Sequence, residues 1–281
     1  MQALLFGLIA ALSWGLHDFC VRYVSQRTSI PTAIMTVLSS GAILICIASL
    51  IWGDWQDLNA YAVQMACLSG VFFSAGSYAL YRAFAIGPVK LVAPITGSFP
   101  IMTVAISALQ GQPVGLGHVI AIFVIVGAVG CVAIFSQERE TTGASVIAVI
   151  WGILAASGFA LTFAIGQEAT RAGAELPVLV VTRAASILAL LAAILLTSGR
   201  PALPSGRVLP VLFIMGALDM VALGLVLISG RLPNPEFASV SSSLFGLITV
   251  ILAWLILKEK VAPLQWVSIA AAFAGIAYLA G

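Results

Sequence analysis

Residues 87–103 carry three prolines inside an otherwise apolar run, Gly87-Pro-Val-Lys-Leu-Val-Ala-Pro-Ile-Thr-Gly-Ser-Phe-Pro-Ile-Met-Thr103. Each proline removes a backbone N–H donor and crowds the preceding turn of a helix. In a lipid bilayer such a defect persists only where protein or a wet cavity satisfies the freed carbonyl groups. The stretch therefore predicts an interrupted membrane helix that faces the protein interior.

A second interrupted stretch occurs at residues 233–249, Pro233-Asn-Pro-Glu-Phe-Ala-Ser-Val-Ser-Ser-Ser-Leu-Phe-Gly-Leu-Ile-Thr249. Phe245 and Thr249 stand 146 residues after Phe99 and Thr103. Paired apolar segments that are broken by glycine or proline at matching places in two halves point to a binding site in membrane carriers. The pair therefore predicts a site at the centre of an internally duplicated chain.

The composition excludes a soluble domain. The chain has 281 residues, of which 62% are hydrophobic and only 8% are charged, whereas soluble domains carry about 25% charged residues. A spanning helix needs about 20 mostly apolar residues. That rule predicts an all-α, multi-pass protein with ten transmembrane helices, at about 3–21, 31–51, 61–82, 91–109, 117–135, 145–166, 176–197, 208–229, 236–257 and 263–280.

The two halves repeat each other. Gly7, Ala11 and Gly15 in the first span match Gly152, Ala156 and Ala160 in the sixth, 145 residues later. Small residues four apart let helix backbones approach closely. We predict a first repeat over residues 1–137, a linker over 138–144 and a second repeat over 145–281. Five helices in each repeat make the two halves antiparallel, which is the inverted arrangement of alternating-access carriers.

Charge sets the expected orientation and partners. Nine lysines and arginines fall in the odd-numbered loops and two on the opposite side, which predicts odd-numbered loops in the cytoplasm and both termini outside. The net charge of +2 does not favour a nucleic-acid partner. Two histidines and four scattered cysteines give no metal-ligand spacing. We expect no metal, no cofactor and no enzymatic activity, because phosphate-binding and hydrolase motifs are absent.

Several short motifs resemble the drug/metabolite transporter superfamily, EamA type. They are Tyr81-Arg-Ala-Phe-Ala-Ile-Gly-Pro88, Val92-Ala-Pro94, Pro100 shortly before Thr103, and Leu257-Lys-Glu259. The resemblance covers nearly the whole chain. It implies export or exchange of small organic metabolites, amino acids among them, across a bacterial inner membrane. Small residues in the tenth helix (Ala270, Ala271, Ala274 and Gly275) leave open a monomer or a homodimer that forms through the fifth and tenth helices.

Three charged residues within or beside the spans are candidates for coupling or for structural roles. Asp219 falls near the middle of the eighth span and Arg183 within the seventh. A structural Arg183–Asp219 pair is the leading interpretation, with substrate binding and proton coupling as alternatives, since charges at this depth are costly unless paired. Asp18 near the end of the first span is expected to pair with Arg22 at the interface. Gln167 and Glu168 occupy the corresponding interfacial place in the sixth span.

The candidate substrate-binding residues combine aromatic rings with small polar groups. Rings would accept a flat or apolar side chain, and a few polar groups would fix its orientation. Each aromatic could instead face lipid or pack in the core, and the serines could serve tight helix packing. The candidates are Trp14, His17, Tyr78, Pro94, Ser98, Phe99, Phe159, Phe163, Ser239, Ser243 and Phe245.

The function predicted from these features is secondary transport of a small polar metabolite by alternating access. Amino acids with aromatic or large neutral side chains, moving outwards, are the favoured substrates. A proton-coupled multidrug exporter is the alternative within transport, and it would need an essential carboxylate at Asp18 or Asp219. A membrane channel is the alternative from a different class.

Overall fold

The computed structural model describes residues 2–102, 105, 115–135, 142–196, 203–233 and 236–279. Every regular element within these ranges is helical. The long helices are α1 (Gln2–Val24), α2 (Ile30–Trp52), α3 (Ala60–Ile86), α6 (Leu116–Phe135), α7 (Thr142–Ala172), α8 (Glu175–Leu196) and α9 (Leu209–Ile228). The others are α4 (Val89–Thr96), α10 (Glu236–Ser242), α11 (Phe245–Leu252), α12 (Pro263–Leu279), a π-helical segment (Ala253–Leu257) and single turns at Trp55–Asp57 and Ser229–Arg231.

Local sequence explains where several helices begin and end. The Asn59 side chain accepts a hydrogen bond from the Ala62 amide at 2.9 Å and so caps one of the free donors at the start of α3. Gly87 at the end of α3 is extended, because the residue before a proline is disfavoured in the helical region. Pro31 stands in the first turn of α2, where its missing N–H costs nothing.

Both proline- and glycine-rich stretches are broken helices, as the sequence predicts. α4 ends at Thr96 and the chain turns at residues 97–98 before helix resumes. α10 ends at Ser242 and the chain turns at residues 243–244, 146 positions later, before α11. The two breaks touch, since a Cβ on Gly97 would lie 3.1 Å from the Ser243 carbonyl oxygen. Thr103 lies outside the described residues.

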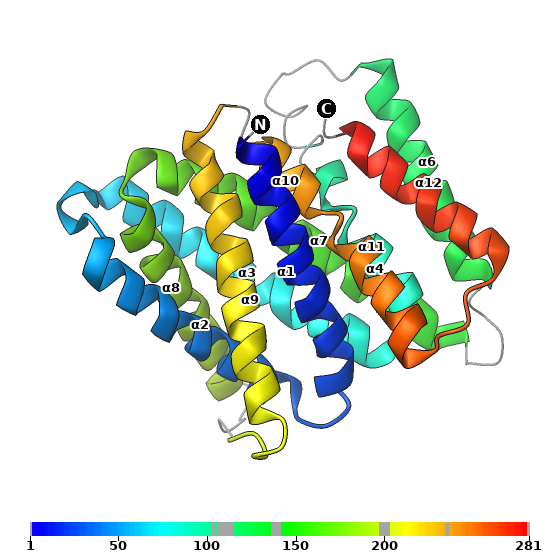
Figure 1. The fold of residues 1–281 in the computed structure, drawn as a ribbon, viewed down its shortest axis with the longest axis horizontal. Coiled ribbons are helices and arrows are strands. Elements are labelled where there is room, and N and C mark those ends of the chain that lie inside the picture. Colours follow the sequence, from blue (N-terminus) through cyan, green and yellow to red (C-terminus); the bar gives the residue numbers. More distant parts are fainter. Residues whose placement is uncertain are drawn as a thin grey trace.

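The ten predicted segments form two inverted five-helix repeats. α3 packs against α7 and α8, while its equivalent α9 packs against α1 and α2. The pairs α2–α8, α4–α11 and α6–α12 each join equivalent helices of the two repeats. In Figure 1, α6 and α12 form one flank of the molecule, α2 and α8 form the other, and both termini lie at the same end. An approximate two-fold axis therefore relates the halves.

The predicted small-residue grooves are occupied by the broken helices. Gly7 of α1 faces Ser241 of α10, and Gly15 faces Ile248 of α11. In the other repeat, a Cβ on Gly152 of α7 would lie 2.9 Å from Ile95 of α4. Each groove thus lets the first helix of one repeat approach the broken helix of the other.

Among the described residues, six helices are long and apolar enough to cross a membrane, which makes this a multi-pass membrane protein. They cover residues 2–24, 30–52, 60–86, 146–172, 175–196 and 209–231. The remaining crossings use shorter or interrupted apolar helices, including Val89–Met102 and Phe245–Leu257. Large apolar side chains are exposed along their outer faces, such as Leu12 at 55% and Phe123 at 73%. These faces meet lipid rather than water.

Candidate functional site

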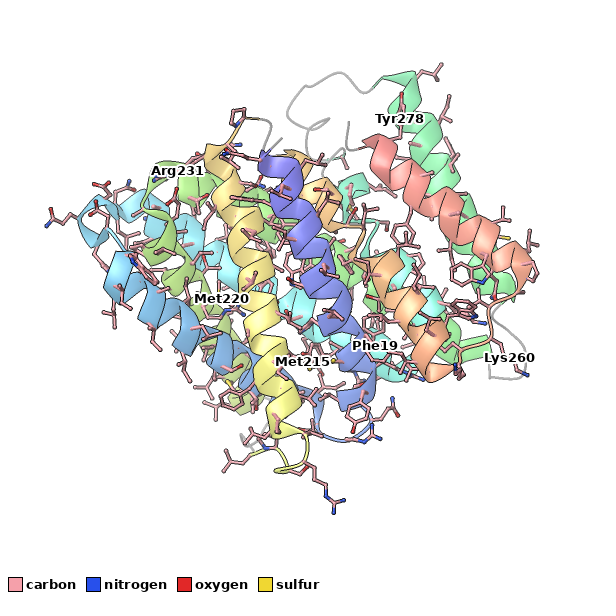
Figure 2. All side chains as sticks on the ribbon, in the orientation of Figure 1. Phe19, Met215, Met220, Arg231, Lys260 and Tyr278 are labelled. Carbon is pink, nitrogen blue, oxygen red and sulfur yellow. The ribbon has the colours of Figure 1, made fainter. Side chains whose placement is uncertain are left out.

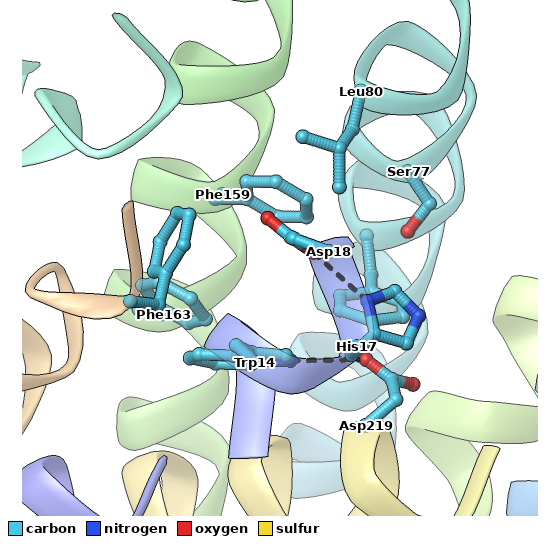
Figure 3. A pocket seen from close by; sticks show the side chains of 10 residues that line it. Trp14, His17, Asp18, Ser77, Leu80, Phe159, Phe163 and Asp219 are labelled. Carbon is cyan, nitrogen blue, oxygen red and sulfur yellow. Dashed lines mark hydrogen bonds and ion pairs between the residues drawn. The ribbon is translucent and has the colours of Figure 1, made fainter. Parts of the chain in front are cut away.

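A small cavity of about 20 Å³, enough for about one water molecule, lies between the two repeats. Its walls come from α1, α3, α7, α9 and α11, and Figure 3 shows their side chains converging on one space. In the order of the ten spans, these helices are the first, third, sixth, eighth and ninth. The lining residues are Trp14, His17, Asp18, Phe73, Ser77, Leu80, Phe159, Phe163, Asp219 and Phe245.

Aromatic rings make up one side of the cavity. The ring of Phe163 stacks on Trp14 with centroids 5.4 Å apart and on Phe159 at 6.2 Å. Phe245 meets Trp14 edge-on at 6.2 Å, and Phe99 meets Phe163 edge-on at 5.1 Å. Offset and edge-to-face contacts of this kind hold rings in fixed orientations. The result is a preformed apolar wall with flat faces.

Asp219 connects the cavity to a buried arginine. Its Oδ2 lies 2.8 Å from Arg183 Nη1, as an ion pair whose N–H is not aligned for a hydrogen bond. Its Oδ1 accepts a hydrogen bond from Trp14 Nε1 at 3.1 Å (Figure 3). Arg183 is 1% exposed, lies 5.1 Å from the centroid of the Phe73 ring and donates to the Met220 sulfur at 3.3 Å. The predicted Arg183–Asp219 pair is thus present, and it positions Trp14.

His17 and Asp18 form a second polar pair at the cavity. His17 Nδ1 and Asp18 Oδ1 are 2.8 Å apart, and the two side chains are only 5% and 3% exposed. His17 Nε2 lies 3.4 Å from the Tyr81 hydroxyl. Successive residues on a helix do not normally face each other, yet here the histidine ring turns to meet its neighbour (Figure 3). The pair is therefore a buried polar group beside the apolar side chains that line the cavity.

One end of the cavity is bridged by α1 and α3. Arg22, one turn beyond Asp18, donates to the carbonyl oxygens of Phe84 at 2.6 Å and Gly87 at 3.3 Å. Gln26 donates to the Ala85 carbonyl at 3.3 Å. These bonds tie the last turn of α1 to the end of α3.

The opposite end is bridged by the equivalent helices of the second repeat. Gln167, 145 residues after Arg22, donates to the Val226 carbonyl at 3.1 Å and to the hydroxyls of Ser229 and Ser239 at 3.2 and 3.0 Å. Arg171 donates to the Gly230 carbonyl at 2.9 Å. The Gln26–Ala85 contact corresponds to the Arg171–Gly230 contact, because each residue of the second contact lies 145 positions after its counterpart in the first. Both ends of the cavity are therefore closed by contacts that the internal symmetry makes equivalent.

The structure brings together only part of the candidate substrate-binding set. Trp14, His17, Phe159, Phe163 and Phe245 line the cavity, and Phe99 supports it through Phe163. The remaining candidates do not line it. Tyr78 borders a separate groove between α2, α3 and α8 and packs on Trp151, Ser239 bonds to Gln167, Pro94 and Ser243 are buried at the helix breaks, and Ser98 donates to the Ile95 carbonyl.

The prediction that Asp18 and Gln167 lie at the membrane interface is wrong. α1 continues to Val24 and α7 to Ala172, so Asp18 and Gln167 lie inside their helices and are buried. No Asp18–Arg22 ion pair occurs among the described residues, because Arg22 bonds to the backbone of α3 instead. The hydropathy rule predicted the ends of both helices too early, because it counts apolar residues only. The last turns of these helices are polar, but they pack against other parts of the protein.

Sequence reasoning missed several residues that shape the cavity. Phe73, Ser77 and Leu80 of α3 line it, and their spacing of three to four residues marks one face of that helix. Tyr81 lies in the motif that carries the family resemblance, yet its contact with His17 was not foreseeable. No group of three or more potential metal ligands occurs among the residues that the structure describes.

Two inverted repeats of membrane helices around a central cavity are the arrangement of a membrane transporter. A model of the EamA-like transporter family matches residues 1–134 and 146–281. The chain therefore belongs to the EamA-like transporter family, whose members are transporters and not enzymes. A small-molecule substrate and a bilayer environment follow from that membership.

Solved structures support the fold. One crystal structure of a protein superposes with a TM-score of 0.69 over 98% of this chain and 95% of its own, at 14% sequence identity. At that identity the similarity concerns the fold alone. No match was found among curated proteins.

The 138–144 linker stays a prediction, since residues 138–141 lie outside the described part of the chain and Thr142–Ala144 begin α7.

Proposed function

We propose that this transporter is a secondary active exporter of small organic metabolites, and that its substrates are amino acids with aromatic or large neutral side chains. The observation that carries the proposal is an aromatic cavity between inverted repeats that is bridged at both ends by equivalent contacts. A site that opens to one side at a time needs two such closures, related by the symmetry of the repeats. Membership in the transporter family supports the same conclusion.

Counterflow in proteoliposomes tests this proposal. Vesicles would be loaded with a mixed pool of amino acids, nucleosides and quaternary cations, and labelled external compounds would be supplied one at a time. We expect transient accumulation of labelled phenylalanine, tyrosine or leucine above the equilibrium level. Accumulation of nucleosides alone would contradict the substrate assignment, and leakage of every compound without accumulation would indicate a channel.

A proton-coupled multidrug exporter is the second candidate, because two carboxylates, Asp18 and Asp219, border the cavity. Intramembrane carboxylates are typical of proton pathways. This candidate predicts accumulation of quaternary cations in the same counterflow experiment. It would be rejected if the Asp18→Asn and Asp219→Asn variants both transported at the unaltered rate.

Alternating access predicts opposite effects from the two end contacts. Arg22→Ala removes the bridge between α1 and α3, whereas Gln167→Ala removes the equivalent bridge between α7 and α9. Each change deletes hydrogen bonds worth about 1 kcal/mol or more, so each should open its own end. We expect a cysteine introduced at Ser77, in a background without the four native cysteines, to react about tenfold faster with a membrane-impermeant thiol reagent.

The side of the membrane to which the thiol reagent is added distinguishes the two variants. Reagent added at the end that holds the odd-numbered loops should gain access in Arg22→Ala, and reagent added at the end that holds the termini should gain access in Gln167→Ala. Arg207→Ala, which changes an exposed arginine, serves as the control and should leave both rates unchanged. Faster labelling from the same side in both variants would contradict alternating access.

We also propose that the protein resides in a bacterial inner membrane with both termini outside. Arg231 and Tyr278 lie towards the end that holds the termini, and Lys260 lies towards the other end (Figure 2). Most lysines and arginines belong to the odd-numbered loops, which supports a cytoplasmic location for those loops. Labelling of a cysteine placed at Gln2 with an impermeant reagent in intact cells tests the orientation. Whether the carrier works as a monomer or a homodimer stays a prediction.

A further inference from the structure

The charges around the cavity do not balance. His17, Asp18 and Asp219 are the titratable side chains among its described lining residues. Arg183 compensates Asp219 at 2.8 Å. Asp18 has only His17, so a neutral histidine leaves one net negative charge in the site. An uncompensated carboxylate at membrane depth is strongly disfavoured.

Within the described residues, no further cation of the surrounding helices reaches the site, and Arg82 on α3 lies instead over the Trp151 ring at 5.7 Å. Besides Asp219 on α9 and its partner on α8, α3 contributes the Tyr81 hydroxyl, and α1 contributes the half-buried thiol of Cys20. The cavity-lining side chains of α7 and α11 are aromatic. Arg22 is bonded to carbonyl groups of α3, and no ion pair other than that with His17 reaches Asp18 within the described residues. One positive charge must therefore come from a proton or from a ligand.

The His17–Asp18 pair can hold that proton and release it. With His17 neutral, Nδ1–H donates to Asp18 and Nε2 accepts from the Tyr81 hydroxyl. With His17 protonated, Nδ1–H still donates to Asp18 and Nε2–H donates to the Tyr81 oxygen. The tautomer depends on these partners, and the hydroxyl can rotate to suit either one. The pair thus keeps both hydrogen bonds in both protonation states.

We infer that a primary ammonium group of the substrate and a proton on the His17–Asp18 pair occupy this site alternately. As the ammonium enters and faces the Asp18 carboxylate, the proton leaves His17 for water, and the net charge of the site does not change. When the ammonium departs on the other side of the membrane, one proton returns. The inference rests on the proposed transport function and names the chemical group that the site recognises.

The cavity holds only about 20 Å³ of free space in this structure, so its walls must part to admit the remainder of such a ligand, and the aromatic character of those walls suits it. The faces of Trp14, Phe159 and Phe163 border the space beside Asp18 (Figure 3), and aromatic faces attract organic cations. The guanidinium of Arg183 is paired with Asp219, so it is not available to a substrate carboxylate. The ligands are therefore amines that carry a flat or large apolar body, and a carboxylate group is not required.

Proton release on binding tests the inference without any transport measurement. The purified full-length protein in detergent, in weakly buffered solution near pH 7, would be mixed with 2-phenylethylamine, phenylalanine or N-acetylphenylalanine. Binding would be followed by equilibrium dialysis of the labelled compounds and protons by an indicator dye. We expect the first two compounds to bind with release of about one proton per bound molecule. The third compound, which lacks an ammonium group, should neither bind nor release protons.

Two variants locate the proton. Asp18→Asn should weaken binding of 2-phenylethylamine at least about tenfold and abolish proton release. Glu168→Gln, which changes a carboxylate outside the cavity, should behave like the unaltered protein. If Asp18→Asn does not fold, His17→Gln should still bind the amine but release no proton.

The outcomes separate this inference from the proposed function. Binding without proton release, binding of N-acetylphenylalanine with equal affinity, or no binding of either amine would overturn it. Phenylalanine counterflow could then still be observed, and the transport proposal would stand. Conversely, proton-releasing binding without any counterflow would support the site and overturn the proposed transport.

Discussion

Replacing Arg183 with leucine is expected to destabilise the protein by about 3–5 kcal/mol, because Asp219 would remain as a buried, unpaired carboxylate. The arginine side chain is 1% exposed, and it is the ion-pair partner of Asp219 within the described residues. The substitution also removes the guanidinium that lies over the Phe73 ring. Reversible unfolding of the purified protein in mixed micelles, or the loss of monodisperse protein after heating, measures the effect.

The double variant Arg183→Leu with Asp219→Leu should regain much of the lost stability. Replacing both members of a buried ion pair by apolar side chains is often close to neutral. Arg207→Leu, at an exposed arginine, should change stability by no more than about 0.5 kcal/mol. If the double variant were as unstable as the sum of the two single variants, the two residues would not be coupled and the expectation would be wrong.

Gly216→Leu is expected to prevent stable folding, with a cost of about 3 kcal/mol or more. Gly216 lies where α9 crosses α2. A Cβ there would sit 2.6 Å from the Val37 carbonyl oxygen and 3.0 Å from the Gly41 amide nitrogen, and it would overlap the Ser40 hydroxyl. Because two of these contacts are with backbone, the helices would have to separate. The yield of monodisperse protein in detergent is the measurement.

The equivalent position in the other repeat should behave in the same way. Gly70 of α3 lies 146 residues before Gly216 and faces the backbone of α8 at Thr182 and Ser186. Gly127→Leu is the matched control, since a Cβ on Gly127 would meet nothing within 4 Å. Normal yields for Gly70→Leu and Gly216→Leu, or an equal loss for Gly127→Leu, would contradict the close packing of these crossings.

The broken helices illustrate what sequence patterns can predict. The sequence predicts one interrupted helix in each stretch and both are present, but the turns fall at residues 97–98 and 243–244, whereas Pro94 lies inside α4. The repeat register also holds in space, because equivalent residues such as Arg22 and Gln167 occupy equivalent ends of the cavity. The aromatic candidates at Trp14, Phe159, Phe163 and Phe245 converge for the same reason.

Other predictions depended on which face of a helix a residue occupies. Tyr78 and Ser77 are neighbours in α3, yet Ser77 lines the cavity and Tyr78 borders a different groove. Hydropathy does not distinguish the inner face of α3 from its outer face, because the lipid on the outer side is as apolar as the protein core. The serines near the second break bond to Gln167 and backbone groups instead of facing the cavity.

Apolar length, proline chemistry and internal periodicity were enough to predict the membrane class, the ten helical segments, the two repeats and the presence of one broken helix in each repeat. The exact position of each break, the contacts of His17 with Asp18 and Tyr81, and the closure of opposite ends by Arg22 and Gln167 required the tertiary structure. These features arise from contacts between helices far apart in the chain. Each is set by the rotation of a helix about its axis, which the packing of all its neighbours determines.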